Sequence, residues 1–140
     1  MNKVHFRSFS PVAIFACRRP DHLVNLFSSI QKNFFFEDTP FFIFIGRPKN
    51  NNDWPLVNKT AETAREFRAP AGVQVIKLFS ESTGSGLIRS GIDRVLKQYD
   101  QVIVLEDDLE VREDFLLYMN SALQHFNFNS EISSVSAWNF

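Results

Sequence analysis

The stretch VIVLEDDLEV, residues 102–111, decides the fold class of this chain. It opens with four apolar residues, and an unbroken run of Val, Ile and Leu is typical of a strand buried on both faces of a parallel sheet. The run delivers three consecutive carboxylates, Glu106, Asp107 and Asp108. We therefore expect these acids at the carboxyl edge of the sheet, where open α/β folds bind ligands. Clustered carboxylate oxygens at such an edge suit Mg²⁺ or Mn²⁺ together with a phosphate-bearing substrate.

Similar apolar runs recur along the chain and alternate with segments of helical periodicity. Five strands are predicted: Pro11–Cys17, Phe41–Ile45, Val73–Phe79, Gln101–Leu105 and Ile132–Trp138. Four amphipathic segments lie between them, with apolar residues three and four positions apart. This alternation predicts an α/β fold with a mostly parallel, Rossmann-like sheet, flanking helices and right-handed crossovers. We expect one domain over residues 1–140 with residues 1–10 as an N-terminal tail, and a fold truncated at its C-terminus because no helix follows the last predicted strand.

The composition argues against several classes of protein. The chain has 140 residues, of which 15 are basic and 16 acidic, and its formal net charge is -1. This balance provides no global field that would attract nucleic acid or an anionic membrane. No apolar segment approaches the roughly 20 residues needed to span a bilayer. The single cysteine, Cys17, excludes an internal disulfide, which fits a reducing compartment. We therefore expect a cytoplasmic protein without a transmembrane segment.

The acidic triplet has two interpretations, a metal site and a solvated acidic turn. Acids that follow a strand often cap the next helix. Glu113 and Asp114 fit that role better than the triplet does, because they directly precede the helix predicted at Phe115. Three adjacent carboxylates repel one another, and a divalent cation would relieve that repulsion. We favour the metal site on this ground.

Basic residues follow two of the predicted strands. Arg18 and Arg19 come directly after the first strand, and Arg47 follows the second. The order of the elements places all three at the same edge as the acids, and guanidinium groups near a helix start suit a diphosphate. The alternative is that these arginines pair with the acidic triplet. Three arginines at one edge favour an anion.

The other polar motifs indicate no separate chemistry. Ser82–Gly86 precedes a predicted helix but lacks the lysine and spacing of a P-loop, and it lacks the G-x-G-x-x-G of a dinucleotide site. The histidines, His5, His22 and His125, are scattered without ligand spacing. Cys17 has no neighbouring base in the sequence, which favours a structural thiol over a nucleophile.

Taken together, these segments resemble a known family. PVAIFACRRPDHL, FIFIGRPKN, ESTGSGLIRSGID, VIVLEDDLEVREDFLLYM and VSAWN occur in this order. They are similar to the nucleotide-sugar-binding part of GT-A-fold glycosyltransferases, closest to the N-acetylglucosaminyltransferase I type and its bacterial relatives. The resemblance extends from Pro11 to Phe140, and its most specific parts are EDDLEV followed by DF, and SAWN.

The resemblance assigns roles to individual residues. It implies that Asp108 binds the Mn²⁺ or Mg²⁺ that bridges the donor diphosphate, as the last acid of the family's D-x-D motif does. It implies that Glu106 and Asp107 face the ribose and the donor sugar, and that Arg19 contacts the nucleotide. The helix that bears Arg89 would flank the donor pocket.

Two departures from the family pattern affect what can be expected of this chain. Relatives commonly end the second strand with an Asp that recognises uracil, whereas this chain has Gly46 and Arg47 there. The family's catalytic base and acceptor-binding half lie beyond the equivalent of Trp138, so no residue is assigned as the base.

The resulting hypothesis is a metal-dependent glycosyltransferase domain that binds a nucleotide-diphosphate sugar, a UDP-sugar first, and transfers the sugar to a hydroxyl of a glycan or another acceptor. One alternative is a non-catalytic binding or assembly module, for instance a homo-oligomer formed through an exposed sheet edge. A third is a receiver-like or phosphoryl-transfer domain that uses Mg²⁺.

Overall fold

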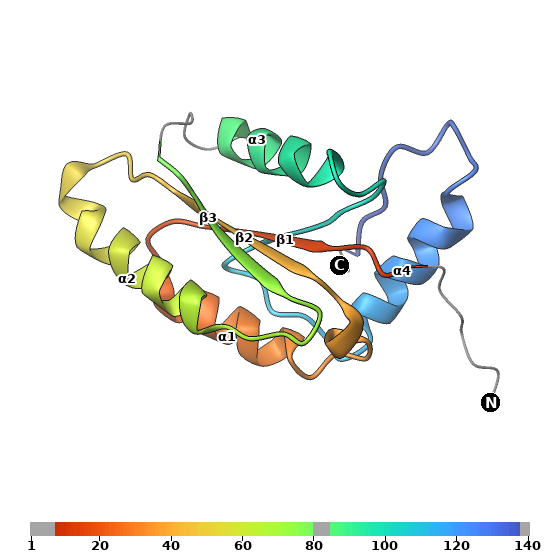
Figure 1. Ribbon diagram of the computed structural model, residues 1–140, viewed down its shortest axis with the longest axis horizontal. Coiled ribbons are helices and arrows are strands. Elements are labelled where there is room, and N and C mark those ends of the chain that lie inside the picture. The colour runs from red at the N-terminus through yellow and green to blue at the C-terminus, as the bar shows by residue number, and fades with distance from the viewer. Residues whose placement is uncertain (1–7, 80–84, 138–140) are drawn as a thin grey trace.

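The computed structural model describes residues 8–79 and 85–137, and it has strands and helices in alternation (Figure 1). The strands are β1 (Val12–Ala16), β2 (Phe41–Gly46), β3 (Val73–Leu78) and β4 (Ile103–Glu106). The α-helices are α1 (Pro20–Ile30), α2 (Trp54–Glu66), α3 (Ser85–Leu96) and α4 (Phe115–Phe126). Two short 3-10 helices, η1 (Phe36–Asp38) and η2 (Asn51–Asp53), precede β2 and α2.

The four strands form one sheet in the order β3-β2-β1-β4, and every neighbouring pair is parallel. The register places Ile14 of β1 opposite Ile43 of β2 and Leu105 of β4. All residues of β1 and β2 are buried, as their unbroken apolar sequences require for central strands. The prediction of an α/β fold with a parallel, Rossmann-like sheet is confirmed.

The prediction of a fifth strand is wrong for the residues that the structure describes. Residues 132–137 are irregular, and the last residue of the predicted strand, Trp138, lies outside the described ranges. Three serines stand among these six residues, and their hydroxyls compete with a strand for backbone groups. Ile132 and Val135 are three positions apart, so they do not share one face of a strand. Only Val135 of residues 132–137 is partly buried.

Two hydrophobic layers cover the sheet. On one face α1, α2 and α4 pack against the strands, and this layer contains Leu23, Val57, Ile43 and Leu116. On the other face α3 packs alone and contributes Leu87 and Val95 to a layer with Phe15, Phe42 and Phe44 (Figure 1). Phenylalanines contribute to both layers, whereas Phe34 and Phe128 are exposed.

Helix α1 shows why the local sequence forms this architecture. Pro20 occupies its first turn, where a missing N–H costs nothing, and Asp21 complements the positive end of the helix. Its buried residues are spaced three and four apart: Leu23, Leu26, Phe27 and Ile30. This stripe packs against the sheet and α2. Helix α1 begins at Pro20, and only three residues separate it from the end of β1 at Ala16, so its first turn lies at the carboxyl edge of the sheet.

The order of the strands reverses between β1 and β4. From β1 the chain moves outward through β2 to β3, and it then crosses by way of α3 to the opposite side of β1 as β4. In open parallel sheets the carboxyl ends of the two strands at such a reversal bound the ligand crevice. The residues after β1 and after β4 therefore occupy the position that the fold favours for a site.

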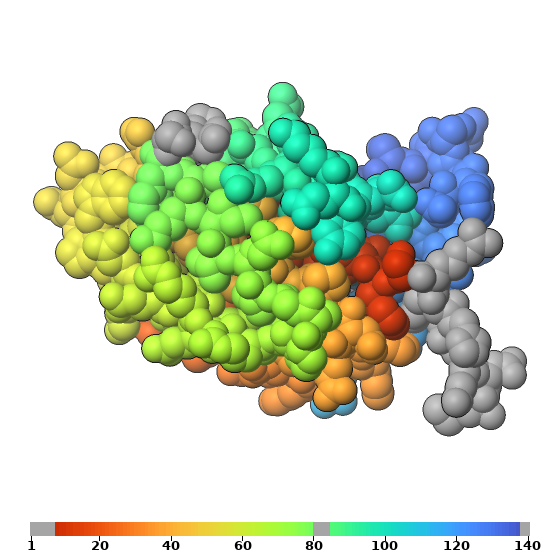
Figure 2. All heavy atoms as spheres, viewed as in Figure 1, coloured from red at the N-terminus to blue at the C-terminus, as the bar shows by residue number. Residues whose placement is uncertain are grey.

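Strand β3 forms the other edge of the sheet, because β2 is its only partner in the described sheet. Figure 2 shows the green side chains of β3 and of the segment before it lying open between α2 and α3. Within residues 8–79 and 85–137, no helix has the length and apolar character of a membrane span.

Candidate functional site at the carboxyl ends of β1 and β4

The acids after β4 lie in a tight turn. The backbone N–H of Leu109 donates to the carbonyl of Glu106 over 3.3 Å, which places Asp107 and Asp108 at the centre of the turn. The N–H of Asp107 also donates to the carbonyl of Phe15 over 3.1 Å, so the pairing with β1 continues one residue past the strand. Asp107 is consequently buried, with 3% of its surface exposed, whereas Asp108 is exposed.

Arg19 joins this turn to the end of β1. Its Nη1 donates to Oδ2 of Asp108 over 3.1 Å, and its Nη2 makes a short hydrogen bond to Oδ1 of Asp107. Partial burial lowers the pKa of the Arg19 guanidinium, but the hydrogen bond and charge of Asp107, and then those of Asp108, outweigh burial and raise the pKa above its ordinary value. The guanidinium is therefore a fixed positive charge that holds both carboxylates in place, and for Arg19 the alternative of pairing with the acidic triplet is confirmed.

Arg18 extends to a different partner. Its Nη1 donates to Oδ2 of Asp53 over 2.9 Å, and Asp53 ends η2 just before α2. The alternative that these arginines pair with the acidic triplet is therefore wrong for Arg18, whose ion pair is with Asp53. No motif in the sequence marks Asp53 as a functional residue, and the only local signal is that an acid stands between the second strand and the next helix, within reach of the arginines at the same edge.

Cys17 lies between these two ion pairs at the end of β1. Its Sγ lies 3.5 Å from the carbonyl oxygens of both Gly46 and Arg47, which share its single weak S–H donor. Burial, and next the negative charge of Asp107, raise the pKa of the Cys17 thiol above its ordinary value, although Arg18 acts in the opposite direction. A thiol with a raised pKa is a poor nucleophile at neutral pH, which agrees with the structural role predicted for it.

The other predicted site residues are exposed and carry no ion pair within the described ranges. Arg47 directly follows β2, one strand further from β4 than Arg19 is. Glu106 is the last residue of β4 and lies opposite Phe15, on the face of the sheet that α3 covers. Arg89 lies on α3, outside the buried stripe of that helix. The structure thus brings Arg19, Asp107 and Asp108 into contact, and it leaves the charges of the other three available to a ligand.

The chemistry of these donors is compatible with a divalent cation at Asp108. Among residues 8–79 and 85–137 there is no group of three or more His, Cys, Asp or Glu side chains that could enclose a metal ion. Mg²⁺ and similar cations are, however, often held by one or two carboxylates together with substrate phosphates and water. Asp108 is 45% exposed, and in the described structure only its Oδ2 is engaged, by Arg19, so Oδ1 is available for such a ligand set.

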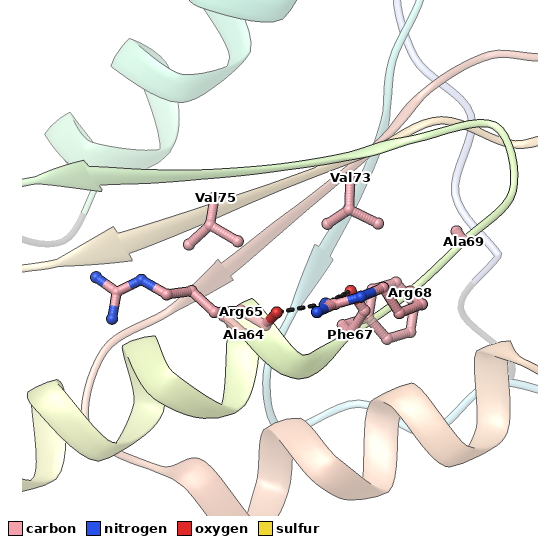
Figure 3. Close-up of a pocket in the computed structure, with 7 residues that line it drawn as sticks. All are labelled: Ala64, Arg65, Phe67, Arg68, Ala69, Val73 and Val75. Atoms are coloured by element: carbon pink, nitrogen blue, oxygen red, sulfur yellow. Dashed lines mark hydrogen bonds between the residues drawn. The ribbon is translucent and has the colours of Figure 1, made fainter.

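Two hollows elsewhere on the surface have a different character. A cavity of about 290 Å³ lies between the end of α2 and the start of β3, away from the acids. Figure 3 shows the guanidinium of Arg68 folded back over the end of α2, where it donates to the carbonyls of Arg65 and Phe67, and the guanidinium of Arg65 lying apart from it. These arginines do not converge on an anion, and Arg68 serves the end of α2.

The second hollow is a groove of about 1310 Å³ along the outer side of β4, bounded by α4 and residues 132–137. Its lining includes Val104, which is 38% exposed although it belongs to a strand. Within the described sheet β4 has no neighbour on this side.

The chain has an α/β fold, and its candidate site lies where the strand order reverses. Residues 89–140 match the model of the GNT-I family, and no curated protein gave a match. The matched segment comprises most of α3, all of β4, the acidic turn and α4. It includes Arg89, Glu106, Asp107 and Asp108, whereas Arg18, Arg19 and Asp53 lie outside it. The match supports a relationship with glycosyltransferases of the GNT-I kind.

Proposed function

We propose that this chain is the donor-binding part of a metal-dependent glycosyltransferase, and that a nucleotide-diphosphate sugar binds across the carboxyl ends of β1 and β4. One observation carries the proposal: at the reversal of the strand order Asp108 is exposed and has one carboxylate oxygen, Oδ1, that Arg19 does not engage. The glycosyltransferase relationship of residues 89–140, which contain the acidic turn, supports the same position.

In this proposal each residue has a distinct task. Asp107, buried and paired, anchors Arg19 and the turn. Asp108 holds Mn²⁺ or Mg²⁺ through the oxygen that Arg19 leaves free. A cation bound there supplies positive charge that stabilises the departing nucleoside diphosphate. Arg19 keeps unused N–H groups that can donate to a phosphate oxygen, since it has five and two are engaged.

The exposed charges around this centre complete the proposed donor site. Arg47 follows the neighbouring strand and has no ion-pair partner among the residues that the structure describes, so it can bind a phosphate or sugar oxygen. Arg89 flanks the site from α3. Glu106 presents a carboxylate that can accept hydrogen bonds from sugar hydroxyls. A UDP-sugar is the donor that we propose first, and a hydroxyl of a glycan or another molecule is the acceptor.

The test is calorimetric titration of the full chain with UDP-sugars and GDP-sugars in the presence and absence of Mn²⁺. We expect at least tenfold tighter binding with Mn²⁺, and we expect Asp108→Asn to remove this metal dependence without changing the melting temperature. Asp100→Asn is the matched control, because Asp100 is also an exposed acid but precedes β4 at the opposite end of the strand. Metal-dependent binding that persists unaltered in Asp108→Asn would refute the assignment.

A non-catalytic assembly module is the second candidate, and the groove beside β4 favours it. Strand β4 has an open outer side in the described sheet, and exposed strand edges readily pair with another chain. The same titration separates the two candidates. A module of this kind would bind no nucleotide sugar and would elute as an oligomer in gel filtration.

A further inference from the structure

Strand β3 leaves a row of backbone groups unpaired at its outer edge. The N–H of Phe41 in β2 donates to the carbonyl of Gly72 over 3.0 Å, and Phe41 lies opposite Val73 in the register of the two strands. Successive residues of a parallel strand direct their N–H and carbonyl groups alternately to its two sides. Val73, Val75 and Lys77 therefore direct theirs away from β2, and no other strand of the described sheet pairs with them.

A cavity lies on the face of the sheet that carries the side chains of these residues. Val73 and Val75 pack against the layer formed with α1 and α2, and both line the cavity of about 290 Å³ at the end of α2 (Figure 3). The other apolar residues of its lining are Ala64, Phe67 and Ala69. A further strand at this edge would lie about 4.8 Å from β3 and would direct every second side chain to this face. One side chain of such a strand would therefore lie at the cavity.

The surroundings of the cavity carry positive charge without an acidic partner. Arg65 is exposed and forms no ion pair within residues 8–79 and 85–137, and Figure 3 shows its guanidinium apart from that of Arg68. Lys77 is also exposed, and in the same ranges its Nζ contacts no acid but lies 5.6 Å from the centroid of the Phe79 ring. The acids in the second half of α2 do not line the cavity: Glu62 and Glu66. The charge at this edge thus favours an acidic ligand.

We propose that the outer edge of β3 binds an extended peptide segment of another protein as an additional strand. An aliphatic side chain of the peptide occupies the cavity, and an acidic side chain two positions away lies at Arg65 and Lys77. In this mode of recognition the backbone hydrogen bonds supply affinity, and the cavity and the charges supply specificity. The interaction is separate from the proposed donor site, because it uses the opposite edge of the sheet from β4.

A second copy of this chain matches the edge less well than an acidic peptide. The sequence of β3 is VQVIKL, which contains no acid. Pairing of β3 with itself would leave Arg65 without a carboxylate and would bring two copies of Lys77 to one edge, where like charges repel.

Three acetylated and amidated peptides test the proposal by calorimetry with the full chain. TETLTET has a leucine with a glutamate two positions away on either side, so it fits both strand directions; TKTLTKT reverses the charges, and TETSTET removes the aliphatic side chain. We expect TETLTET to bind at least tenfold more tightly than either of the other two.

A pair of charge-reversal variants tests the role of Arg65. Arg65→Glu should weaken the binding of TETLTET at least tenfold. Arg94→Glu is the matched control and should leave the affinity unchanged, because Arg94 is also an exposed arginine in the last turn of its helix, but that helix is α3 on the other face of the sheet.

Amide hydrogen exchange locates the peptide without any substitution. When TETLTET saturates the chain, exchange at the N–H groups of Val75 and Lys77 should slow at least tenfold. The N–H groups of Gln74 and Ile76 face β2, so their exchange should change by less than about twofold.

Several outcomes would overturn the proposal. Slower exchange in Ile103–Glu106 instead of β3 would place the peptide at β4, and protection of β3 that increases with chain concentration without peptide would mean that a second copy occupies the edge; either result overturns it. No binding of TETLTET at about 1 mM, equal binding of the three peptides, or an equal effect of Arg65→Glu and Arg94→Glu overturns it as well. None of these results bears on the donor site, which the titration with nucleotide sugars tests by itself.

Discussion

Arg19 and Asp107 form an ion pair that spans the two strands between which the sheet reverses its order. Asp107 is buried and Arg19 is partly exposed, so the arginine offsets the cost of placing a carboxylate inside the fold. The same guanidinium also holds the exposed carboxylate of Asp108. One side chain therefore combines a structural task with the positioning of the proposed ligand for the metal.

Replacing Arg19 tests the structural half of this relationship. Arg19→Ala leaves the buried Asp107 without its counter-charge, and we expect a loss of about 2 kcal/mol in the free energy of unfolding. This is below the value for a fully buried pair because Arg19 is partly exposed. The measurement is urea denaturation. Arg112→Ala removes an arginine that is 90% exposed and should change stability by less than about 0.5 kcal/mol.

The double variant Arg19→Ala/Asp107→Asn separates the loss of a counter-charge from the loss of packing at Arg19. A neutral amide at position 107 needs no counter-charge, so the double variant should be more stable than Arg19→Ala alone. If both variants lose the same stability, the cost of Arg19→Ala arises from packing rather than from the buried charge.

The sequence predicts the central strands of the sheet because their signal, an unbroken run of apolar residues, is contained within each strand. The unbroken apolar runs in β1 and β2 belong to central strands that are fully buried, and they could not serve any other position in a parallel sheet. The position of Arg19 beside the acids also follows, because the carboxyl ends of parallel strands share an edge. The roles of Arg19, Arg47, Arg89, Glu106, Asp107 and Asp108 in donor binding remain predictions.

Contacts between residues far apart in the chain could not be predicted from local sequence patterns. Glu113 and Asp114 were expected to cap α4, and Asp114 does stand at its N-terminus, but its side chain makes no capping hydrogen bond. The cap comes instead from Asn33, 83 residues away, whose Oδ1 accepts from the N–H of Leu116 over 2.9 Å. The choice of Arg18 between two acids likewise depends on which loops the fold brings together.

The contact of Asn33 with α4 leads to a second prediction. Asn33 is 6% exposed. Its Oδ1 accepts from the N–H of Leu116, and its Nδ2 donates to the carbonyl of Ser29 over 3.3 Å. Asn33→Ala leaves both groups without this partner, and we expect a loss of about 1–2 kcal/mol in unfolding free energy. Asn25→Ala on the exposed side of α1 is the control. Equal stability of the two variants would show that water replaces the Asn33 amide.

Gly91 sets the distance between α3 and the sheet. A Cβ atom at this position would lie 2.4 Å from Cε1 of Phe15 and 3.1 Å from Cδ2 of Phe44, and these two rings are stacked. Gly91→Ala should therefore destabilise the protein by about 2 kcal/mol, even though alanine is about 1 kcal/mol better than glycine inside a helix.

Two further variants separate the steric effect at Gly91 from a general effect on helices. Phe15→Leu in the Gly91→Ala background should recover part of the stability, because the shorter side chain makes room for the methyl group. Ser121→Ala on the exposed face of α4 should be neutral or slightly stabilising. Thermal unfolding measures the melting temperatures of Gly91→Ala, the Gly91→Ala/Phe15→Leu double variant and Ser121→Ala. An increase in the melting temperature of the single variant Gly91→Ala would contradict the close packing.

Cys17 provides a chemical probe of the charges around it. Burial and Asp107 raise the pKa of its thiol, and a raised pKa means that less of the reactive thiolate is present at any pH below it. We expect alkylation by iodoacetamide to be slower than that of free cysteine at neutral pH, with the midpoint of the rate profile displaced to higher pH. Asp107→Asn removes one of the charges that raise the pKa, so the midpoint should move back toward lower pH.

Asp108→Asn is the matched control, since Asp108 is not among the charges that act on Cys17, and it should leave the midpoint in place. An equal displacement in both variants would mean that the turn had opened and exposed the thiol, rather than that the charge of Asp107 acts on it.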